Sequence, residues 1–447
     1  MKGLSFIYFF LLLHAVQPGI ANGARWKQPA GDPEYLHRAV KQVTDVIVHD
    51  VYSPPVASRT YAYISVAAYE AARFEDQSFL SLAGQLQGLT AFTPPDPKKK
   101  YNYLLAAVNA VLLTGKTMVI SEALIEDFRK KILREFSATG MPRELFDNSL
   151  AFGKSVADQV IAWAAGDHYR QTRGLPKYTV TDDSESWKPT PPAYMKAVEP
   201  YWGRIRPFVL EAILQFAPPP PTVFSTDTAS AFYKEAAEVQ RTGLQLTEEQ
   251  VAIANFWDCN PFKMNVNGHV LFATRKISPG GHWMNIARLA CRATGASVLR
   301  SAAVYASLAV AMADAFIVCW AEKYRSRVIR PETYINRYIS ESWTPLLQTP
   351  PFPEYTSGHS VVSGAAAVVL TVFFGADFSY TDSTELEFEI PVRHFSSFRK
   401  AAEEAAISRL YGGIHYMPAV KNGLAGGTAI GEYVAAKLKT SPGVKPR

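Results

Sequence analysis

The chain has 447 residues, of which 48% are hydrophobic and 12% aromatic, and its formal net charge is +6. This length and apolar content suffice for a large core, built as one big domain or as two bundled halves. The basic excess is mild and is not gathered in a tail, so it argues against nucleic acid as a partner, while it suits anionic ligands.

The N-terminal residues have the layout of a secretory signal peptide. Lys2 precedes an apolar run over Leu4–Val16, and small residues follow at positions 21–24. A positive start, a short apolar core and small residues at the cut are typical of signal peptides. We expect a signal peptide over residues 1–23 and a secreted or periplasmic protein. The alternative is an uncleaved anchor, which the short apolar run disfavours. No transmembrane segment is expected after cleavage, because the nearest candidate, residues 297–320, carries Arg300 and Asp314.

Helical periodicity dominates the rest of the chain. Apolar residues recur at helical spacing over the segments 61–74, 102–113, 122–136, 143–165, 229–240, 297–320, 403–410 and 418–438. Ser225 or Thr226 is a candidate cap for the segment 229–240, and Thr247 with Gln250 has the pattern of a capping box. Alternation with period two is scarce, so the sequence predicts an all-α fold, a helical bundle with little or no sheet.

Prolines and glycines indicate how these helices are arranged. The run Pro218–Pro221 divides the chain into an N-terminal helical half, residues 24–220, and a C-terminal helical domain, residues 221–447. The long, polar and aromatic segment Tyr178–Gly203 is predicted to be a covering loop. In the last predicted helix a glycine recurs every four residues, which predicts close contact with another helix.

A proline-rich loop leads into the most apolar predicted helix. The loop and first turn span Pro351–Ser360, and the run Val361–Phe374 is almost entirely apolar or small. Thr356 or Ser357 can cap this helix, whose free N–H groups and positive dipole end favour an anion. His359 stands in the first turn. The alternative interpretation is a capped helix with a surface histidine.

Basic residues and a second histidine flank this helix in the sequence. Lys323 and Arg330 are seven residues apart, a spacing that would put them on one face of a helix. Arg409 is followed by two glycines, which break the helix and allow His415 to turn into a pocket. The alternatives are a solvated basic face and an ordinary helix end with a stray histidine.

Taken together, these segments predict a site for a tetrahedral oxyanion. Its neutralising cations are Lys323, Arg330 and Arg409, and Ser357 with the amide of Gly358 would bind further oxygens. One of the two histidines can bond the central atom while the other acts as acid or base on the opposite side.

The same three segments resemble the motifs of a known family. Lys323, six residues, then Arg330-Pro331; Thr356-Ser357-Gly358-His359; and Ser408-Arg409, five residues, then His415 are similar to those of the vanadium-dependent haloperoxidases and the type 2 phosphatidic acid phosphatase superfamily. The likeness is greatest to bacterial, iodoperoxidase-like members. It covers roughly residues 310–420 and departs at Thr356, where the family often has proline. It implies two four-helix bundles.

The resemblance also implies a role for each motif residue. His415 would bond vanadium, or would carry the phosphoryl group in a phosphatase, and His359 would be the acid–base residue. Lys323 would also polarise bound peroxide. The residues that would hold the oxygens of vanadate are Lys323, Arg330, Ser357, Gly358 and Arg409.

Three further residues are assigned by the same resemblance. Trp320 and Phe352 stand where chloroperoxidase-type members have aromatic residues near the halide. Asp258 corresponds to an acid that braces an anion-binding arginine. The alternative for the two aromatic residues is core packing.

The function expected is peroxide-dependent halide oxidation with vanadate as cofactor. Iodide is the favoured halide and bromide a possible one, because Glu354 and Thr356 would admit water and weaken the activation of peroxide. Phosphate is expected to compete with vanadate. The alternatives are a secreted acid phosphatase acting through a phosphohistidine and an oxyanion-binding protein without turnover; the oligomeric state stays open.

Overall fold

A computed structural model describes residues 26–267 and 270–441, and the predicted signal peptide lies outside the described residues. The helices of the first half are α1 (Glu34–His49), α2 (Pro54–Ala72), α3 (Tyr103–Lys116), α4 (Glu122–Ala138), α5 (Arg143–Ala165) and α6 (Tyr169–Arg173). Those of the second half are α7 (Ala231–Leu244), α8 (Glu248–Phe256), α9 (Pro279–Ala293), α10 (Val298–Ser326), α11 (Pro331–Tyr338), α12 (Gly358–Phe374), α13 (Phe398–Tyr411) and α14 (Met417–Lys437).

Sheet is confined to two small antiparallel hairpins in the described ranges. They pair β1 (Met264–Asn267) with β2 (Val270–Ala273) and β3 (Tyr380–Asp382) with β4 (Arg393–Phe395). Short 3-10 turns complete the structure at Pro29–Gly31, Arg73–Glu75, Trp202–Arg204, Ile213–Phe216 and Leu386–Phe388. The predicted all-α class is confirmed.

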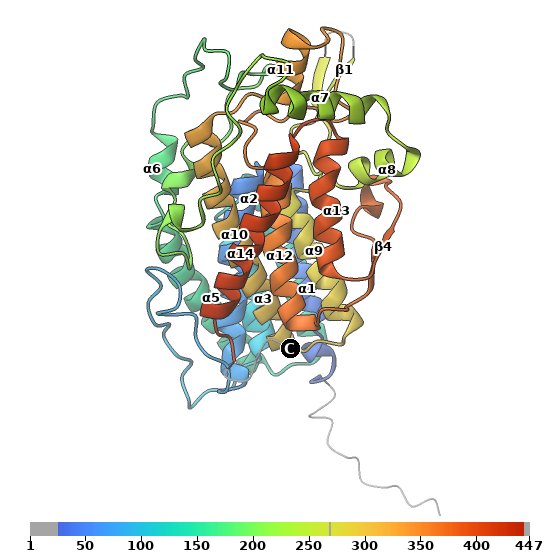
Figure 1. Cartoon of the computed structure of the whole chain (residues 1–447). Coiled ribbons are helices and arrows are strands. Elements are labelled where there is room, and N and C mark those ends of the chain that lie inside the picture. Colours follow the sequence, from blue (N-terminus) through green and yellow to red (C-terminus); the bar gives the residue numbers. More distant parts are fainter. Residues whose placement is uncertain (1–25, 268–269, 442–447) are drawn as a thin grey trace, which may run out of the picture.

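The long helices lie side by side, roughly along the long axis of the molecule, whereas α7, α8 and α11 cross one end (Figure 1). In the first half, α3 packs against α1, α2, α4 and α5; in the second, α12 packs against α9, α10, α13 and α14. The predicted glycine stripe lies at the contact of α14 with α12. A Cβ at Gly427 would come 1.9 Å from the carbonyl oxygen of Val361, so only glycine permits this approach.

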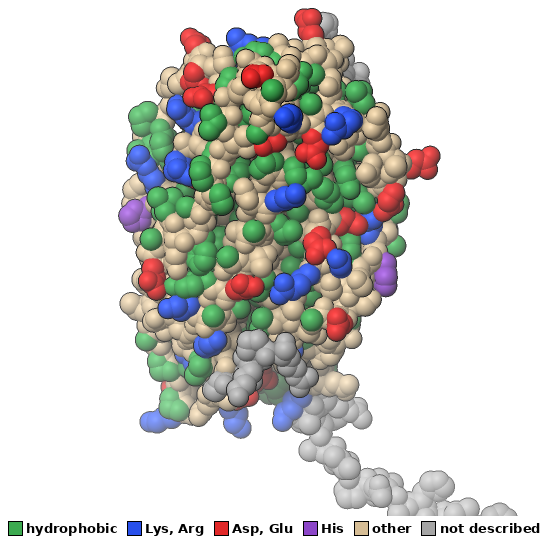
Figure 2. All heavy atoms as spheres, in the orientation of Figure 1, with side chains coloured by type: hydrophobic (Ala, Val, Ile, Leu, Met, Phe, Trp, Pro, Cys, Tyr) green, Lys and Arg blue, Asp and Glu red, His purple; other side chains and the backbone are tan. Residues whose placement is uncertain are grey.

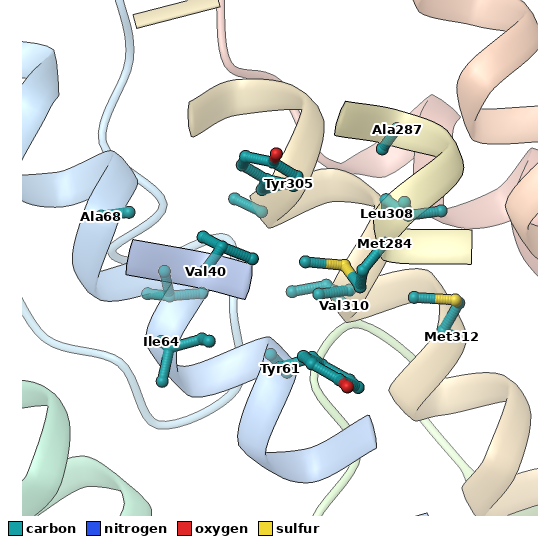
Figure 3. Packing of buried hydrophobic residues seen from close by; sticks show 14 of the residues in the cluster. Val40, Tyr61, Ile64, Ala68, Met284, Ala287, Tyr305, Leu308, Val310 and Met312 are labelled. Carbon is teal, nitrogen blue, oxygen red and sulfur yellow. The ribbon is translucent and has the colours of Figure 1, made fainter. Parts of the chain in front are cut away.

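One hydrophobic core joins the two halves. Figure 3 shows Val40 of α1 and Tyr61 of α2 packed against Met284 of α9 and Val310 of α10. Helix α10 is long and apolar enough to cross a membrane, but the apolar window is buried entirely inside the protein. It therefore serves as a core helix here. On the face that Figure 2 shows, basic and acidic side chains are interspersed.

The segment Tyr178–Gly203 covers the C-terminal end of α10, as predicted. The amide of Trp187 donates to the carbonyl of Arg327 at 2.7 Å, and that of Val198 donates to the carbonyl of Pro351 at 3.1 Å. The indole of Trp320 donates to the carbonyl of Val198 at 3.2 Å. These bonds hold the loop over the elements that carry Lys323 and Phe352.

Several predicted elements differ from the structure. Helices α1, α9 and α11 are absent from the sequence-based prediction, and α7 is capped by Ser230 rather than by Ser225 or Thr226. The capping box of Thr247 and Gln250 is confirmed. Prediction located α7 two residues too early because several small polar residues precede it, and only one of them has its side chain directed at the helix.

Candidate active site

The first turn of α12 provides the neutral donors of the site. Ser357 is the N-cap, and its hydroxyl oxygen accepts from the amide of Ser360 at 3.3 Å and from the Ser360 hydroxyl at 2.8 Å. Gly358 opens the helix against the ring of Trp320, where an added Cβ would lie 3.4 Å from the nearest ring carbon. Free amides at a helix start favour a bound anion.

Three cations are buried around this turn. Lys323 comes from the last turn of α10, Arg330 is the N-cap of α11, and Arg409 lies in the last turn of α13. Each side chain belongs to a residue that is at most 1% exposed. The prediction that Lys323 and Arg330 share one helix face is wrong, because α10 ends at Ser326 and the chain turns at Arg327, whose φ is 52°.

The two arginines are held by backbone carbonyls. Arg330 donates from Nε to the carbonyl of Phe352 at 2.9 Å and from Nη1 to that of Ile414 at 2.8 Å. Arg409 donates from Nη1 to the carbonyl of Trp257 at 2.8 Å. Within the described ranges, Nη2 of Arg330 and Nε of Arg409 are buried without a hydrogen-bond partner. Burial lowers the pKa of Arg330 to about 10 and lowers that of Arg409.

The ammonium group of Lys323 donates to backbone carbonyls, whereas its predicted role was to donate to the oxygens of an anion. Its Nζ donates to the carbonyls of Pro353 and Glu354, each at 3.0 Å, and to that of Thr356 at 2.5 Å. An ammonium has three N–H donors. All three are engaged, so in this arrangement Lys323 acts on an anion through its charge. Burial lowers the pKa of Lys323 to about 7.

His415 is oriented by a carboxylate that the sequence interpretation missed. Its Nδ1 lies 2.7 Å from Oε1 of Glu354, which also accepts from the amide of Tyr416 at 3.0 Å. A proton on Nδ1 leaves a lone pair on Nε2, which lies 3.2 Å from Nη1 of Arg330. Burial and then the charge of Arg330 hold the pKa of His415 well below its usual value. The geometry therefore presents a neutral ligand nitrogen.

Glu354 and Thr356 do not admit water to the site, contrary to the sequence-based expectation. Glu354 is 1% exposed and directed at His415, and burial raises its pKa to about 7. The Thr356 hydroxyl is directed at the sulfur of Cys319, 3.7 Å away. The polar groups of Glu354 and Thr356 contact other residues inside the fold. The sequence signal that could have indicated the role of Glu354 was an acid in a proline-stiffened loop.

His359 lies in the first turn of α12, as predicted. Its Nε2 is buried and has no hydrogen-bond partner among the described residues. Burial and then the charge of Arg409 lower the pKa of His359 well below the usual value for histidine. Its ring nitrogen is thus available to accept a proton from a ligand.

A small cavity brings six of the predicted residues together, whereas Lys323, Arg330 and Ser357 are not part of its lining. Trp320, Phe352, Gly358, His359, Arg409 and His415 line it, with Phe316, Phe262 and several prolines. The ring centroids of Trp320 and Phe352 are 4.9 Å apart, and Nζ of Lys323 lies 5.7 and 5.2 Å from them. Both aromatic residues thus belong to the cavity wall, which is mostly apolar.

A larger cleft of about 700 Å³ adjoins this cavity beneath the covering loop. Phe262 lines both. The wall of the larger cleft includes four tyrosines, Tyr52, Tyr169, Tyr178 and Tyr201.

Asp258 braces no arginine directly. Its Oδ2 lies 2.6 Å from Nζ of Lys276 and 3.9 Å from Nζ of Lys263. Burial lowers the pKa of Arg409 and the negative charge of Asp258 opposes this lowering, but Arg409 donates directly to the neighbouring carbonyl of Trp257. The brace predicted for Asp258 is therefore supplied by the residue beside it.

Comparisons with known proteins identify the family of the chain. A family model described as the VCPO second helical-bundle domain matches residues 338–442. The crystal structure of the first bacterial vanadium-dependent iodoperoxidase has 50% sequence identity and a TM-score of 0.87, covering 92% of this chain and 98% of that one.

Two further crystal structures share the fold at lower identity. The holo and apo forms of a bacterial vanadium-dependent chloroperoxidase are each 15% identical, with TM-scores of 0.61 and 0.65. They cover 87% and 86% of this chain and 94% of each of theirs. No curated protein matches the chain. Half of the residues are identical to those of the iodoperoxidase over almost the whole length of both chains. The chain therefore belongs to the vanadium-dependent haloperoxidases.

Proposed function

We propose that this haloperoxidase oxidises iodide in preference to bromide and chloride, using hydrogen peroxide and a vanadate held beneath α12. The observation that carries the proposal is a set of buried cations without a carboxylate partner, next to a neutral imidazole, in an apolar cavity. The residues proposed to hold vanadate are Lys323, Arg330, Ser357, Gly358, Arg409 and His415.

The residues present suit an oxyanion. Nη2 of Arg330, Nε of Arg409 and Nε2 of His359 are buried polar atoms that lack partners in the described part of the chain. Buried charges are expensive unless paired, so an anion that accepts from the two arginine nitrogens stabilises them. Bound vanadate supplies a Lewis-acidic centre that makes peroxide electrophilic toward halide.

The side chains divide the remaining work. We assign ligation to Nε2 of His415, whose proton Glu354 holds on Nδ1. We assign proton transfer to Nε2 of His359, which is neutral and unpaired in the described structure. Lys323 contributes positive charge beside the rings of Trp320 and Phe352, whose centroids lie 5.7 and 5.2 Å from its Nζ.

Iodide is favoured for two physical reasons. It gives up electrons most readily of the three halides, so the modest field of a lysine shared among three carbonyls suffices. Moving an ion from water into an apolar cavity costs least for a large, weakly hydrated ion. The iodoperoxidase relative, at 50% identity, supports the same halide. The proposed preference for iodide therefore rests on an apolar cavity, and not on the water-filled cavity expected from the sequence.

The test is a steady-state comparison of iodide, bromide and chloride with peroxide on vanadate-loaded protein at several pH values. We expect iodide to be fastest, bromide slower and chloride slowest or inactive. Chloride turnover equal to iodide would contradict the halide preference. Hydrolysis of nitrophenyl phosphate without any halide turnover would instead support the phosphatase alternative.

We also propose that phosphate competes with vanadate, because both are tetrahedral oxyanions that the same arginines would bind. Reconstituting the vanadium-free protein in rising phosphate tests this, and undiminished reconstitution would contradict it.

Export rests on the pattern of Lys2 and Leu4–Val16. Mass spectrometry of the protein released by its native host would contradict it by finding Met1 retained.

A further inference from the structure

We propose that the protein has a second metal site, formed by Cys259, His282 and Glu385, which binds zinc beside the oxyanion cavity. Sγ of Cys259, one ring nitrogen of His282 and a carboxylate oxygen of Glu385 all lie within 4.8 Å of one another. The three residues are buried, and they come from the segment after α8, from α9 and from the turn after β3.

The spacing of the ligand atoms suits a metal ion. Nδ1 of His282 lies 3.5 Å from Sγ of Cys259 and 3.0 Å from Oε1 of Glu385. Zinc binds sulfur at about 2.3 Å and nitrogen or oxygen at about 2.0–2.2 Å. The distances between the ligand atoms found here are therefore close to those between neighbouring ligands of one zinc ion. A thiolate, an imidazole and a carboxylate together match the ligand preference of zinc.

An outer carboxylate fixes the histidine for this role. Nε2 of His282 lies 2.8 Å from Oδ2 of Asp382. Asp382 itself accepts from the amide and the hydroxyl of Thr384, at 3.0 and 2.7 Å. A proton held on Nε2 by Asp382 leaves Nδ1 as the ligand atom, the arrangement in which metal-binding histidines are usually supported. The ring of Trp257 stacks on the imidazole, with centroids 4.6 Å apart.

A buried carboxylate oxygen faces the proposed site. Oε1 of Glu385 belongs to a residue that is only 3% exposed, and its contact in the described ranges is the one with Nδ1 of His282 at 3.0 Å. A buried carboxylate is costly unless a positive charge lies beside it, and a zinc ion would supply that charge.

Metal binding would preserve the net charge of the cluster. One Zn²⁺ would replace two protons, one from the thiol of Cys259 and one from Nδ1 of His282, and both protons would be released to solvent. The bonds formed are zinc to sulfur, nitrogen and oxygen, and no oxidation or reduction is involved.

The proposed ion would brace the wall of the active site. Cys259 lines the same cavity as His359 and Arg409. The neighbouring Trp257 links the two sites, because its carbonyl accepts from Arg409 while its ring stacks on His282. Zinc would thus fix the short segment between α8 and β1 and so stabilise the position of Arg409.

The experiment measures metal in the full-length protein purified without chelators. Elemental analysis should find about one zinc per chain, independent of the vanadium content. Cys259→Ser should lose most of that zinc. Cys291→Ser is the matched control, since Cys291 is also buried but lies outside the cluster, and it should retain zinc.

Cobalt(II) gives a second readout on the wild-type chain. Cobalt bound at this site should show a thiolate-to-metal charge-transfer band that is absent in Cys259→Ser and weakened or shifted in Glu385→Gln. Folded wild-type protein that takes up neither zinc nor cobalt from excess metal would overturn the proposal and leave a buried ion-pair cluster. Vanadium content and iodide oxidation of the same sample test the proposed function separately.

Discussion

Helix α2 of the first half and helix α12 of the second are built alike but differ in the chemistry at their N-termini. α2 and α12 are both buried over most of their length, and both start at a serine cap. The hydroxyl oxygen of Ser53 accepts from the amide of Val56 at 3.4 Å, and that of Ser357 accepts from the amide of Ser360 at 3.3 Å. After the cap, α2 continues with Pro54 and Pro55, where α12 has a glycine and a histidine.

The cations near the two helices are also neutralised differently. In the first half, Arg59 pairs with the buried Asp167 at 2.5 Å and Arg73 with Glu70 at 2.6 Å. In the second, Arg330 and Arg409 contact carbonyls and keep unpartnered nitrogens in the described structure. At the start of α2, prolines remove two helix-start donors, and carboxylates pair with Arg59 and Arg73, so neither arginine offers an unpaired charge to a ligand. A buried, capped helix is therefore not enough to make an oxyanion site.

The largest effect is expected for His415→Ala, which removes the proposed vanadium ligand. The variant should lose vanadium retention, measured by elemental analysis after gel filtration. His37→Ala is the control from the first half, where a buried histidine bonds to Tyr305 at 2.7 Å. Equal vanadium content in the two folded variants would contradict the assignment.

His359→Ala should separate binding from turnover. It removes the proposed proton-transfer nitrogen but none of the cations, so vanadium should be retained while kcat for iodide falls by about 10²–10⁴-fold. Vanadium content and kcat measured on the same sample decide this. A variant with normal kcat would remove His359 from the mechanism.

Glu354→Gln should weaken vanadate binding through His415. The amide keeps the shape of the carboxylate but holds Nδ1 less firmly, and such supporting contacts are typically worth about 10–100-fold in metal affinity. Titration with vanadate measures the Kd. Glu70→Gln in the first half is the control, because it alters a buried Arg73 pair far from α12 in the sequence and should leave the Kd unchanged. The same Kd in both variants would contradict the positioning role.

The smallest effect tests the helix start directly. Gly358→Pro makes the first residue of α12 resemble that of α2 and removes one amide donor, which should raise the Kd for vanadate about 10-fold, the lower end for a hydrogen bond to a charged group. Gly358→Ala keeps the amide, and its Cβ would only touch Trp320, at 3.4 Å. If the two variants bind alike, the amide is not part of the site.

Local patterns determined the helical class and most of the candidate site. Helix α5 was predicted with the bounds that the structure has, because its apolar period and flanking signals agree. The cap at Ser357 and the first-turn position of His359 follow from neighbouring residues alone. Such features depend on energies within one or two turns of chain, which a sequence displays directly.

Tertiary packing decided the contacts between distant segments. The turn after α10 directs Lys323 and Arg330 to one point from two helices, and Glu354 meets His415 across 61 residues of chain. Cys259 and His282 approach only because the segment after α8 packs against α9. No local pattern encodes these meetings, since a side chain's partner depends on which surfaces the whole core brings together.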